Sequence, residues 1–569
     1  MMRRTHPWLG LGVAVAVYAV LAFVLFHDAW LTPGQIIAGS GNDPPMFAWY
    51  LQWTPWAISH GHNPLVTDYL VYPGGANMMW NTSLVLPALV LWPVTAAFGS
   101  IVTFNTLMTL APIASATVAF LALRRHASQP AAGIGAAVYA FSPILVAHDQ
   151  AHAQFAFAVI PPLALMLMED IITAPNRRRR IRAGVLLGIA STAQFLIGSE
   201  LLAITGFGII VGLAVLALIR REQIRAHLRG LAAGLGAAVV TFLVTASIPL
   251  VVLFFGPQRI SGPIQPPGVF VQDLVGLVVP GPNQVVSAPN SSELYQSFIG
   301  NAGESSGYFG VLLLAALGIF VWLRRDRILV RWAAVVAAVL VIFALGPALH
   351  VAGHLTHVPF PWRLFQWMPL LNNIVPARFI ILSFLLVGLL VAVLIDDVAR
   401  LPAVSYRFAA GAALTAVAVS LVPKPIPVTA TQTPPFFVTA AVDRIAPGDV
   451  AVVIPYKSPA VAMVWQAQSG MRFRMPSGRI FTPLPSPHLG PPPSPLTNEL
   501  FAIEAGGSVA SLPPAQRSAL LADMRRMHVT SVVIGPTRYT SQMVALFSQL
   551  LEQPPQEVAG VLFWGDVRP

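Results

Sequence analysis

Cysteine is absent from the 569-residue chain, and charged side chains are few. Without cysteine the protein has no disulfide framework, no thiolate nucleophile and no zinc–thiolate site. Asp, Glu, Lys and Arg make up only 10% of the sequence, whereas a soluble domain carries about 25%. Because 56% of the residues are hydrophobic, the composition excludes a single soluble domain and predicts a polytopic α-helical membrane protein.

The charges that are present are mostly basic, and they are clustered. The net charge is +11, with 33 Lys and Arg against 22 Asp and Glu. Arginines stand in short groups between apolar runs, and residues 28–100 contain no Lys or Arg. This pattern is typical of the cytoplasmic loops of a membrane protein and not of a nucleic-acid-binding surface.

Apolar runs of about 20 residues predict membrane-spanning helices. We expect about eleven spans, an uncleaved first span and a cytoplasmic N-terminus. The apolar run 84–98 contains two prolines, and a full span there would place Arg124 and Arg125 outside, so we interpret it as an interfacial helix. The expected spans are residues 8–27, 101–123, 130–147, 154–172, 183–198, 201–219, 230–255, 307–323, 329–346, 379–395 and 406–422.

The composition changes at the end of the predicted membrane domain, 1–422, which includes the outer loop 28–100. Five prolines make residues 423–435 a stiff linker. Residues 436–569 have the composition of a soluble protein, and we predict a small extracytoplasmic α/β domain there. Its expected strands are residues 449–454, 529–534 and 560–564, and its expected helix is 514–527.

Asp43 is the acid that stands out in the first outer loop. It lies in Asn42-Asp43-Pro44-Pro45, directly after the first span and beside aromatic residues. A carboxylate at membrane depth is costly and is therefore a functional hypothesis. A solvated carboxylate in a proline-containing turn is the alternative.

Other ionisable groups fall on the outer side in the same topology. Asp149 stands between His148 and His152, and Glu200 lies at the tip of the next outer loop. The i, i+3 spacing of Asp149 and His152 puts both on one helical face, where they could bind a divalent cation or share acid–base work. Interfacial histidines and a helix-capping glutamate are the simpler alternatives.

Three arginines of the membrane part also lie on the outer side. A guanidinium binds a lipid phosphate bidentately, although an arginine can also simply anchor the end of a span. Asp68 is a secondary candidate in the first loop. In the C-terminal domain, Trp465 and Gln466 are candidate acceptor contacts, and a stable lid with a satisfied core is the alternative. The outer arginines are Arg259, Arg363 and Arg378.

Several short motifs follow one another in a characteristic order. They are Asn42-Asp43-Pro44, Asn63-Pro64-Leu65, Asp68-Tyr69-Leu70, Tyr72-Pro73-Gly74-Gly75, Met79-Trp80-Asn81-Thr82, His148-Asp149, Pro376-Ala377-Arg378-Phe379 and Trp465-Gln466-Ala467. One span followed by a large outer loop with an early acid, then a second outer loop with an acid, completes the pattern. The chain thereby resembles the GT-C superfamily of integral membrane glycosyltransferases, in particular bacterial members with an outer C-terminal domain.

The resemblance implies transfer of a hexose or pentose from a polyprenyl-phosphate-type lipid donor to a glycan, lipid or protein acceptor. It places this reaction on the outer face of the bacterial cytoplasmic membrane. Asp43 is implied as base or acceptor-positioning residue, Asp149 as ligand of a metal or of the donor phosphate, and Arg378 as phosphate ligand. The Asp-Xaa-Asp form common at the second site is absent, so a requirement for Mg or Mn stays open. Single, inverting displacement is the simplest mechanism.

Two other functions are compatible with the sequence. A transporter or flippase of a lipid-linked glycan would place charges within the spans, where few are found. A non-catalytic scaffold of the cell envelope would need neither outer acid. The enzymatic interpretation expects Asp43 and Asp149 to converge at the outer mouth of a lipid-accessible chamber.

Overall fold

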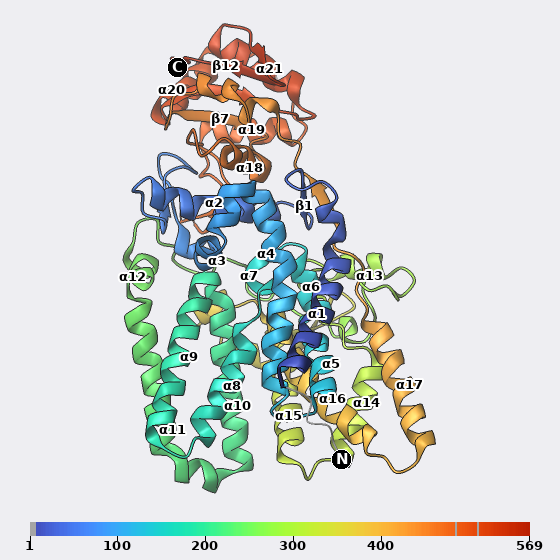
Figure 1. Ribbon diagram of the computed structural model, residues 1–569. Helices are drawn as coiled ribbons and strands as arrows, with labels where there is room; N and C mark the ends of the chain where they lie inside the picture. The colour runs from blue at the N-terminus through green and yellow to red at the C-terminus, as the bar shows by residue number, and fades with distance from the viewer. Residues whose placement is uncertain (1–6, 484–485, 509–510) are drawn as a thin grey trace. The chain divides into compact units, whose positions relative to one another are not determined.

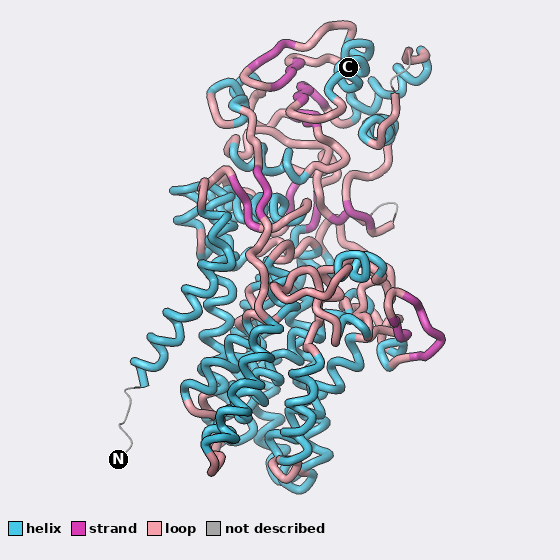
Figure 2. Tube along the Cα trace, turned by 90° about the vertical axis from the view of Figure 1, so that its right-hand side faces the viewer, coloured by secondary structure: helices cyan, strands magenta, loops and turns pink. Residues whose placement is uncertain are grey.

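A computed structural model of the chain describes residues 7–483, 486–508 and 511–569. Long helices dominate the chain, and its strands are short (Figure 2). Contacts group the residues into two compact units. Unit 1 comprises Met1–Asp28, Leu107–Ser247 and Gln265–Pro427, and unit 2 comprises Ala29–Thr106, Ile248–Ile264 and Val428–Pro569. The first outer loop thus groups with the C-terminal region, and the division of the chain at residues 422 and 435 stays a prediction.

Unit 1 is a helical bundle, in which α9 runs beside α11 and α16 packs against α5 and α15 (Figure 1). A short hairpin, β4 (Ala348–Val351) with β5 (His354–Pro359), interrupts the helices. The helices are α1 (Pro7–Phe26), the second part of α4 (Trp92–Leu123), α5 (Gln129–Ala140), α6 (Pro143–Asp149), α7 (Ala153–Ala156), α8 (Ile160–Thr173), α9 (Arg177–Ile197), α10 (Ser199–Ile219), α11 (Arg221–Thr245), α13 (Ser291–Ser297), α14 (Val311–Leu323), α15 (Ile328–Ala344), α16 (Phe379–Ala399) and α17 (Val404–Leu421).

Each of the eleven predicted spans contains a helix. Among the described residues, eight helices are long and apolar enough to cross a membrane, or nine if the α5–α6 pair, bent by 51°, is one span. The remaining two predicted spans correspond to α14 and α15, which have 13 and 17 residues and are shorter than a full crossing. The chain is therefore a multi-pass membrane protein, with fewer full-length spans than predicted.

The predicted interfacial segment 84–98 is not one continuous helix. It consists of α3 (Val85–Val90) and the first turns of α4, and it ends at Gly99. Gly99 has φ 81° and ψ 171°, which breaks the helical geometry inside α4. Because only glycine adopts this backbone conformation without strain, Gly99 separates the short segment from the long apolar helix that follows it.

Two ends of the unit 1 bundle carry charge. Asp397, near the end of α16, accepts hydrogen bonds from Arg324 Nε at 2.6 Å and Arg327 Nη1 at 2.9 Å. The sequence predicts that all three residues are cytoplasmic, and their side of the membrane stays a prediction. Arg378 stands directly before the first residue of α16, at the opposite end of this helix from Asp397. At the rise per residue of an α-helix, the two residues are about 29 Å apart along the helix axis. That length matches the thickness of the hydrocarbon core of a bilayer.

Two glycines let α5 and α16 approach closely within the bundle. A Cβ atom on Gly135 would collide with the carbonyl oxygen of Gly388, and a Cβ atom on Gly388 would collide with that of Gly135. Small residues at such a crossing allow the backbones of membrane helices to touch. This contact fixes α16, the most completely buried span, and with it the position of Arg378.

Unit 2 contains a four-stranded sheet in the order β11-β12-β10-β7. Strands β7 (Val450–Ile454) and β10 (Val529–Ile534) pair in parallel, and β12 (Val561–Trp564) and β11 (Gln556–Val558) add antiparallel strands. The predicted strands and the predicted helix are confirmed, the latter as α20 (Pro514–Arg526). The other helices of this part are α18 (Ala460–Gln468), α19 (Pro495–Glu504) and α21 (Thr540–Leu551).

The first outer loop forms the remainder of unit 2. Strand β1 (Ile36–Ala38) pairs with β6 (Val428–Ala430), so the predicted linker contains a strand. The helix α2 (Asp43–Ser59) packs against α18, and α12 (Ser247–Phe255) belongs to the same unit. The remaining strands are β2 (Val66–Thr67), β3 (Ala76–Asn77), β8 (Phe481–Thr482) and β9 (His488–Leu489).

Candidate functional site

Asp43 is the first residue of α2 in unit 2. The prolines that follow it suit the first helical turn, where backbone N–H groups have no partner within the helix. The Oδ1 atom of Asp43 accepts a hydrogen bond from Arg479 Nε at 2.8 Å and forms an ion pair with Arg479 Nη2 at 2.6 Å. The side chains are 20% and 27% exposed. The predicted acid is thus held by an arginine that belongs to the C-terminal part of the chain.

Trp465 and Gln466 lie in the core of unit 2. Gln466 accepts a hydrogen bond from Trp49 Nε1 at 2.6 Å and donates to the carbonyl oxygens of Tyr69 at 3.0 Å and Phe473 at 2.6 Å. Both residues are buried. Gln466 thereby joins α18 to α2, and Trp465 stacks on Phe437 with 5.1 Å between ring centroids. Both side chains pack inside unit 2, and their contact with an acceptor stays a prediction.

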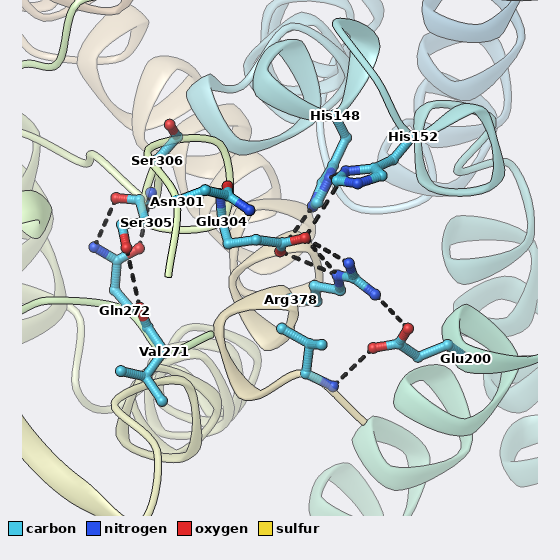
Figure 3. Close-up of polar contacts among 12 residues, drawn as sticks. His148, His152, Glu200, Val271, Gln272, Asn301, Glu304, Ser305, Ser306 and Arg378 are labelled. Carbon is cyan, nitrogen blue, oxygen red and sulfur yellow. Dashed lines mark hydrogen bonds and ion pairs between the residues drawn. The ribbon is translucent and has the colours of Figure 1, made fainter. Parts of the chain in front are cut away.

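A buried ionic cluster occupies the end of the unit 1 bundle that carries Arg378. The Arg378 guanidinium donates to Glu304 through Nε, 3.0 Å from Oε2, and through Nη2, 2.5 Å from Oε1. Its Nη1 donates to Glu200, which also accepts from the backbone N–H of Val375 at 2.8 Å. Figure 3 shows Arg378 between the two carboxylates. Its guanidinium carbon also lies 4.2 Å from the centre of the Phe155 ring.

Two histidines, His148 and His152, also face the Glu304 carboxylate (Figure 3). His148 Nε2 is 4.0 Å from Oε2, and His152 Nδ1 is 3.8 Å from Oε1. The Nδ1 atoms of the two rings are 3.0 Å apart. His148 is fully buried, and its Nε2 atom has no hydrogen-bond partner among the described residues.

These three side chains could hold a metal ion. One ligand atom from each of His148, His152 and Glu304 lies within 4.8 Å of the others. The buried Nε2 atom of His148, aimed at the carboxylate without a hydrogen bond, is the kind of orphaned acceptor that a metal satisfies. A donor set of two imidazoles and one carboxylate suits Zn or Mn better than Mg, which prefers oxygen ligands.

Glu304 lies in the loop before α14, and its backbone is also fixed. Asn301 Oδ1 accepts from the N–H of Glu304 at 2.9 Å, and Ser305 Oγ donates to the carbonyl of Val271 at 3.1 Å (Figure 3). Burial disfavours the charge of Glu304, but Arg378 and the two histidines outweigh burial and lower its pKa to about 2. The carboxylate is therefore ionised at neutral pH.

The remaining predicted site residues differ in burial and in the partners of their side chains. Asp149 is buried, and its Oδ2 atom has no hydrogen-bond partner among the described residues. Asp68 pairs with Arg474 at 3.3 Å, whereas Arg259 and Arg363 are exposed. Asp43 belongs to unit 2 and Asp149 to unit 1, so the convergence of the two acids stays a prediction.

Two residues of these clusters, Glu304 and Arg479, are missing from the sequence-based candidates. Glu304 lies in the sequence Asn301-Ala302-Gly303-Glu304-Ser305-Ser306, directly before an apolar run. An acid in a polar turn at the outer end of a span was a usable signal, of the same kind as that at Glu200. Arg479 has no comparable signal, because arginines are common on soluble domains.

A large apolar cavity lies among the helices of unit 1. Its volume is about 500 Å³, and α8, α10, α15 and α16 line it with side chains such as Leu165, Leu213, Trp332 and Leu385. Gly208 and Gly212 face it from α10. Such a cavity accepts a hydrocarbon chain and has little to offer a polar ligand.

Residues 9–422 match a family described as a domain of unknown function, DUF6311. The chain belongs to this family. A search of curated protein sequences finds no match. The family match covers all the predicted spans except the first residue of the first one, and it includes both Asp43 and the Arg378 cluster.

The chain is also similar to solved structures of an oligosaccharyltransferase and of ArnT. One is the Archaeoglobus fulgidus oligosaccharyltransferase AglB with an inhibitory peptide and a dolichol-phosphate, at 12% identity and a TM-score of 0.46, covering 96% of this chain and 71% of that one. Another is Cupriavidus metallidurans ArnT bound to undecaprenyl phosphate, at 12% identity and a TM-score of 0.41, covering 98% of each chain. The membrane-helix bundle and the small C-terminal sheet that the sequence predicts are both present.

Proposed function

We propose that this DUF6311 protein is a membrane glycosyltransferase that moves a sugar from a polyprenyl-phosphate-type donor to a glycan, lipid or protein acceptor outside the cytoplasm. The observation that carries the proposal is the buried cluster of Arg378, Glu304, His148 and His152. A membrane protein keeps such a cluster only where its cost is offset by function, because buried ionisable groups in a bundle are expensive.

The charges of this cluster favour an anionic ligand together with a cation. Arg378, Glu200 and Glu304 leave a net charge of −1 when the histidines are neutral. A divalent cation on His148, His152 and Glu304 would reverse that sign, and a phosphate group would offset the excess positive charge. We therefore propose Zn or Mn as the cation in place of Mg, and the donor phosphate as the anion. When bound, the cation supplies Lewis acidity to a phosphate oxygen.

Arg378 has a positioning role in this proposal. Its guanidinium is already shared between Glu304 and Glu200, so it orients the carboxylate that would hold the cation. It also adds positive charge where a phosphate would gain negative charge on leaving. The exposed Arg259 and Arg363 are not placed in this cluster and are secondary candidates for the donor phosphate.

The apolar cavity of unit 1 suits the lipid tail of the donor. Its walls are mostly hydrocarbon, although His126, Glu169 and Arg220 are also among the lining residues. A polyprenyl chain is long and apolar, and burial of each methylene-sized group stabilises binding by about 0.8 kcal/mol. This cavity therefore supports a lipid-linked donor over a water-soluble nucleotide sugar.

Asp43 is the proposed base. Its carboxylate accepts the proton of an acceptor hydroxyl while the hydroxyl oxygen attacks the anomeric carbon of the donor sugar. The bond from that carbon to the phosphate oxygen breaks, and the lipid phosphate leaves with the electron pair. A single displacement of this kind inverts the anomeric centre and needs no carboxylate nucleophile.

The test is a transfer assay with the purified full-length chain in lipid nanodiscs. A panel of radiolabelled polyprenyl-phosphate hexoses and pentoses is incubated with a cell-envelope extract as the source of acceptor. We expect label to leave the lipid fraction, and Asp43→Asn to abolish this transfer while the thermal unfolding temperature stays unchanged. Asp443→Asn, which changes another acid of unit 2, is the matched control.

Other outcomes of the assay separate the alternative functions. Movement of intact donor across the membrane without transfer would indicate a flippase. Absence of both transfer and transport across the whole panel would contradict the enzymatic proposal and favour a scaffold.

A further inference from the structure

The connection between α15 and α16, residues 345–378, exposes several large apolar side chains. Six of them are between 46% and 75% exposed, and four of the six fall within residues 364–370. Single apolar side chains are common on protein surfaces, whereas a group of this density marks a surface that contacts another apolar phase. The proposed transfer reaction uses none of the six, which are Leu355, Val358, Leu364, Trp367, Met368 and Leu370.

The same segment is fixed on the bundle by aromatic rings. Trp362 is 2% exposed, and its ring centroid lies 5.5 Å from that of Phe365 and 5.3 Å from that of Phe379, at the start of α16. The Phe365 ring also lies 5.5 Å from Phe207 of α10 and 5.7 Å from Phe343 of α15. The segment is therefore apolar where it contacts the bundle and apolar again on its exposed surface.

The backbone of this segment satisfies much of its own hydrogen bonding. Four N–H groups donate to carbonyl oxygens three or four residues earlier, at 2.9–3.2 Å, and they belong to Arg363, Phe365, Gln366 and Met368. Pro361 and Pro369 have no N–H group to satisfy. A segment whose peptide groups are paired internally can lie where water is scarce.

The length of α15 places the start of this connection within a leaflet. Arg327, directly before α15, pairs with Asp397 at the charged end of the bundle. From there the 17 residues of α15 rise about 26 Å, which is less than the hydrocarbon core of about 30 Å. The residues that follow α15 therefore begin below the surface of the opposite leaflet.

Charge in this connection is confined to one side chain. Residues 345–377 contain no Asp, Glu or Lys, and Arg363 is their one arginine. Its side chain is exposed and stands beside the exposed Leu364. An arginine in such surroundings lays its stem against hydrocarbon and its guanidinium against a phosphate. With no acid nearby in sequence, the segment does not repel the phosphates of a lipid surface.

We infer that residues 361–370 form an interfacial anchor that lies in the lipid bilayer, in the leaflet at the start of α16. Trp367 lies at the boundary between headgroups and acyl chains, where tryptophan is enriched in membrane proteins. Leu364 and Leu370 contact acyl chains, and Arg363 binds a phospholipid phosphate. This contact with the bilayer goes beyond the proposed transfer and does not depend on it.

The absence of cysteine from the sequence makes a site-specific test direct. Trp367→Cys provides a single attachment point for a nitroxide spin label, and Trp367 is 75% exposed, so its replacement leaves the packed core unchanged. The full-length protein is placed in nanodiscs of phosphatidylcholine and phosphatidylglycerol without any polyprenyl lipid. Electron paramagnetic resonance measures the collision rates of the label with oxygen and with a water-soluble nickel chelate.

Two further single-cysteine variants give reference values. Ile210→Cys labels an exposed position in the middle of α10, a candidate span, and Ser518→Cys labels an exposed position of α20 in unit 2. Oxygen partitions into apolar surroundings and the chelate does not, so we expect an oxygen-to-nickel collision ratio at Trp367→Cys at least about threefold above that at Ser518→Cys. It should approach the ratio at Ile210→Cys. Each variant is first shown to keep the wild-type unfolding temperature.

A charge substitution tests the contact of Arg363 with phosphate. Arg363→Asp, added to Trp367→Cys, replaces an attraction to phosphate by a repulsion, and we expect the collision ratio of the label to fall about twofold. Arg325→Asp is the matched control, because Arg325 is an exposed arginine at the other end of the bundle, and it should leave the ratio unchanged.

Three results would overturn the inference. A collision ratio at Trp367→Cys equal to that at Ser518→Cys would show that the segment lies in water. Low collision rates with both reagents would show that protein, and not lipid, covers it. An effect of Arg363→Asp no larger than that of Arg325→Asp would reject the contact with phosphate.

Discussion

Arg479 donates a hydrogen bond from Nε to Asp43 Oδ1 at 2.8 Å, and its Nη2 atom forms an ion pair with the same oxygen at 2.6 Å. The two residues are 436 positions apart in sequence but belong to the same compact unit. The orientation of the acid that follows the first span is therefore set by the C-terminal part of the chain. This contact gives that part a direct role in positioning the proposed base, in addition to any contact with ligands.

Substitution of Arg479 should reduce transfer without unfolding the protein. Arg479→Met removes the hydrogen bond and the ion pair with Asp43, and a misplaced catalytic group typically costs about 100-fold in rate. The rate is measured with the transfer assay, and thermal unfolding shows whether the fold is kept. Arg444→Met removes an arginine that bonds the exposed Gln556 and should retain the wild-type rate. Equal rates in Arg479→Met and Arg444→Met would show that the pair does not position Asp43 for catalysis.

Removal of one histidine should remove bound metal. We expect protein purified with Zn or Mn to retain about one ion per chain by elemental analysis, and more of either than of Mg. His148→Ala should reduce that content at least tenfold, because three ligands become two. His126→Ala is the control, since His126 pairs with Glu169 elsewhere in unit 1. Metal retained equally in both variants would place the ion elsewhere.

His350 should make the protein less stable in mild acid. It lies in β4, and burial lowers its pKa below 6.5, although the carboxylate of Asp273 favours the charged ring. The unfolded chain therefore takes up the proton more readily. Stability that is present above pH 6.5 is lost as the pH falls below that value, by at most about 1.4 kcal/mol per pH unit.

The comparison that isolates this residue is His350→Leu with His354→Leu. Unfolding temperatures are measured from pH 7.5 to 5.5. The unfolding temperature of the wild-type protein should fall over this pH range. It should fall less in His350→Leu, and it should fall as much as in the wild type in His354→Leu, because His354 is exposed. Identical pH profiles for all three proteins would mean that His350 does not contribute.

Gln466→Leu should destabilise unit 2 strongly. The leucine leaves Trp49 Nε1 and the carbonyls of Tyr69 and Phe473 without the partners they have now. Each buried polar group left unsatisfied costs about 1–3 kcal/mol. Gln516→Leu changes an exposed glutamine of α20 and should shift the stability by less than about 0.5 kcal/mol. A normal unfolding temperature for Gln466→Leu, with altered acceptor preference, would support the acceptor-binding interpretation.

The segments predicted best are those whose signal is local. Apolar runs of membrane length became helices, and the short β-branched runs at 449–454 and 529–534 became neighbouring parallel strands. The lengths of α14 and α15 were less certain because an apolar run does not show where its helix starts. Gly310 is the N-cap that sets the start of α14 at Val311, and Leu345 is the C-cap that ends α15.

The roles of polar residues, in contrast to the positions of helices and strands, do not follow from local sequence patterns. Trp465 and Gln466 have the residue types of a ligand site, yet Trp49, Tyr69 and Phe473 use up the hydrogen-bonding capacity of the glutamine. Glu304 lies in a polar turn before an apolar run, yet nothing in that turn indicates that its carboxylate faces both histidines. A side chain's role depends on partners that distant segments supply, and sequence spacing does not carry that information.

By itself, the sequence determined that this chain crosses a membrane many times, which parts of it are helical, and where a small sheet forms. Each of these properties follows from hydrophobicity over a short stretch of residues. Only the tertiary structure decided that Arg378 lies between Glu200 and Glu304, and that Arg479 holds Asp43. An ion pair depends on distances of a few ångströms between residues far apart in the chain, and those distances exist only after the helices and strands have packed.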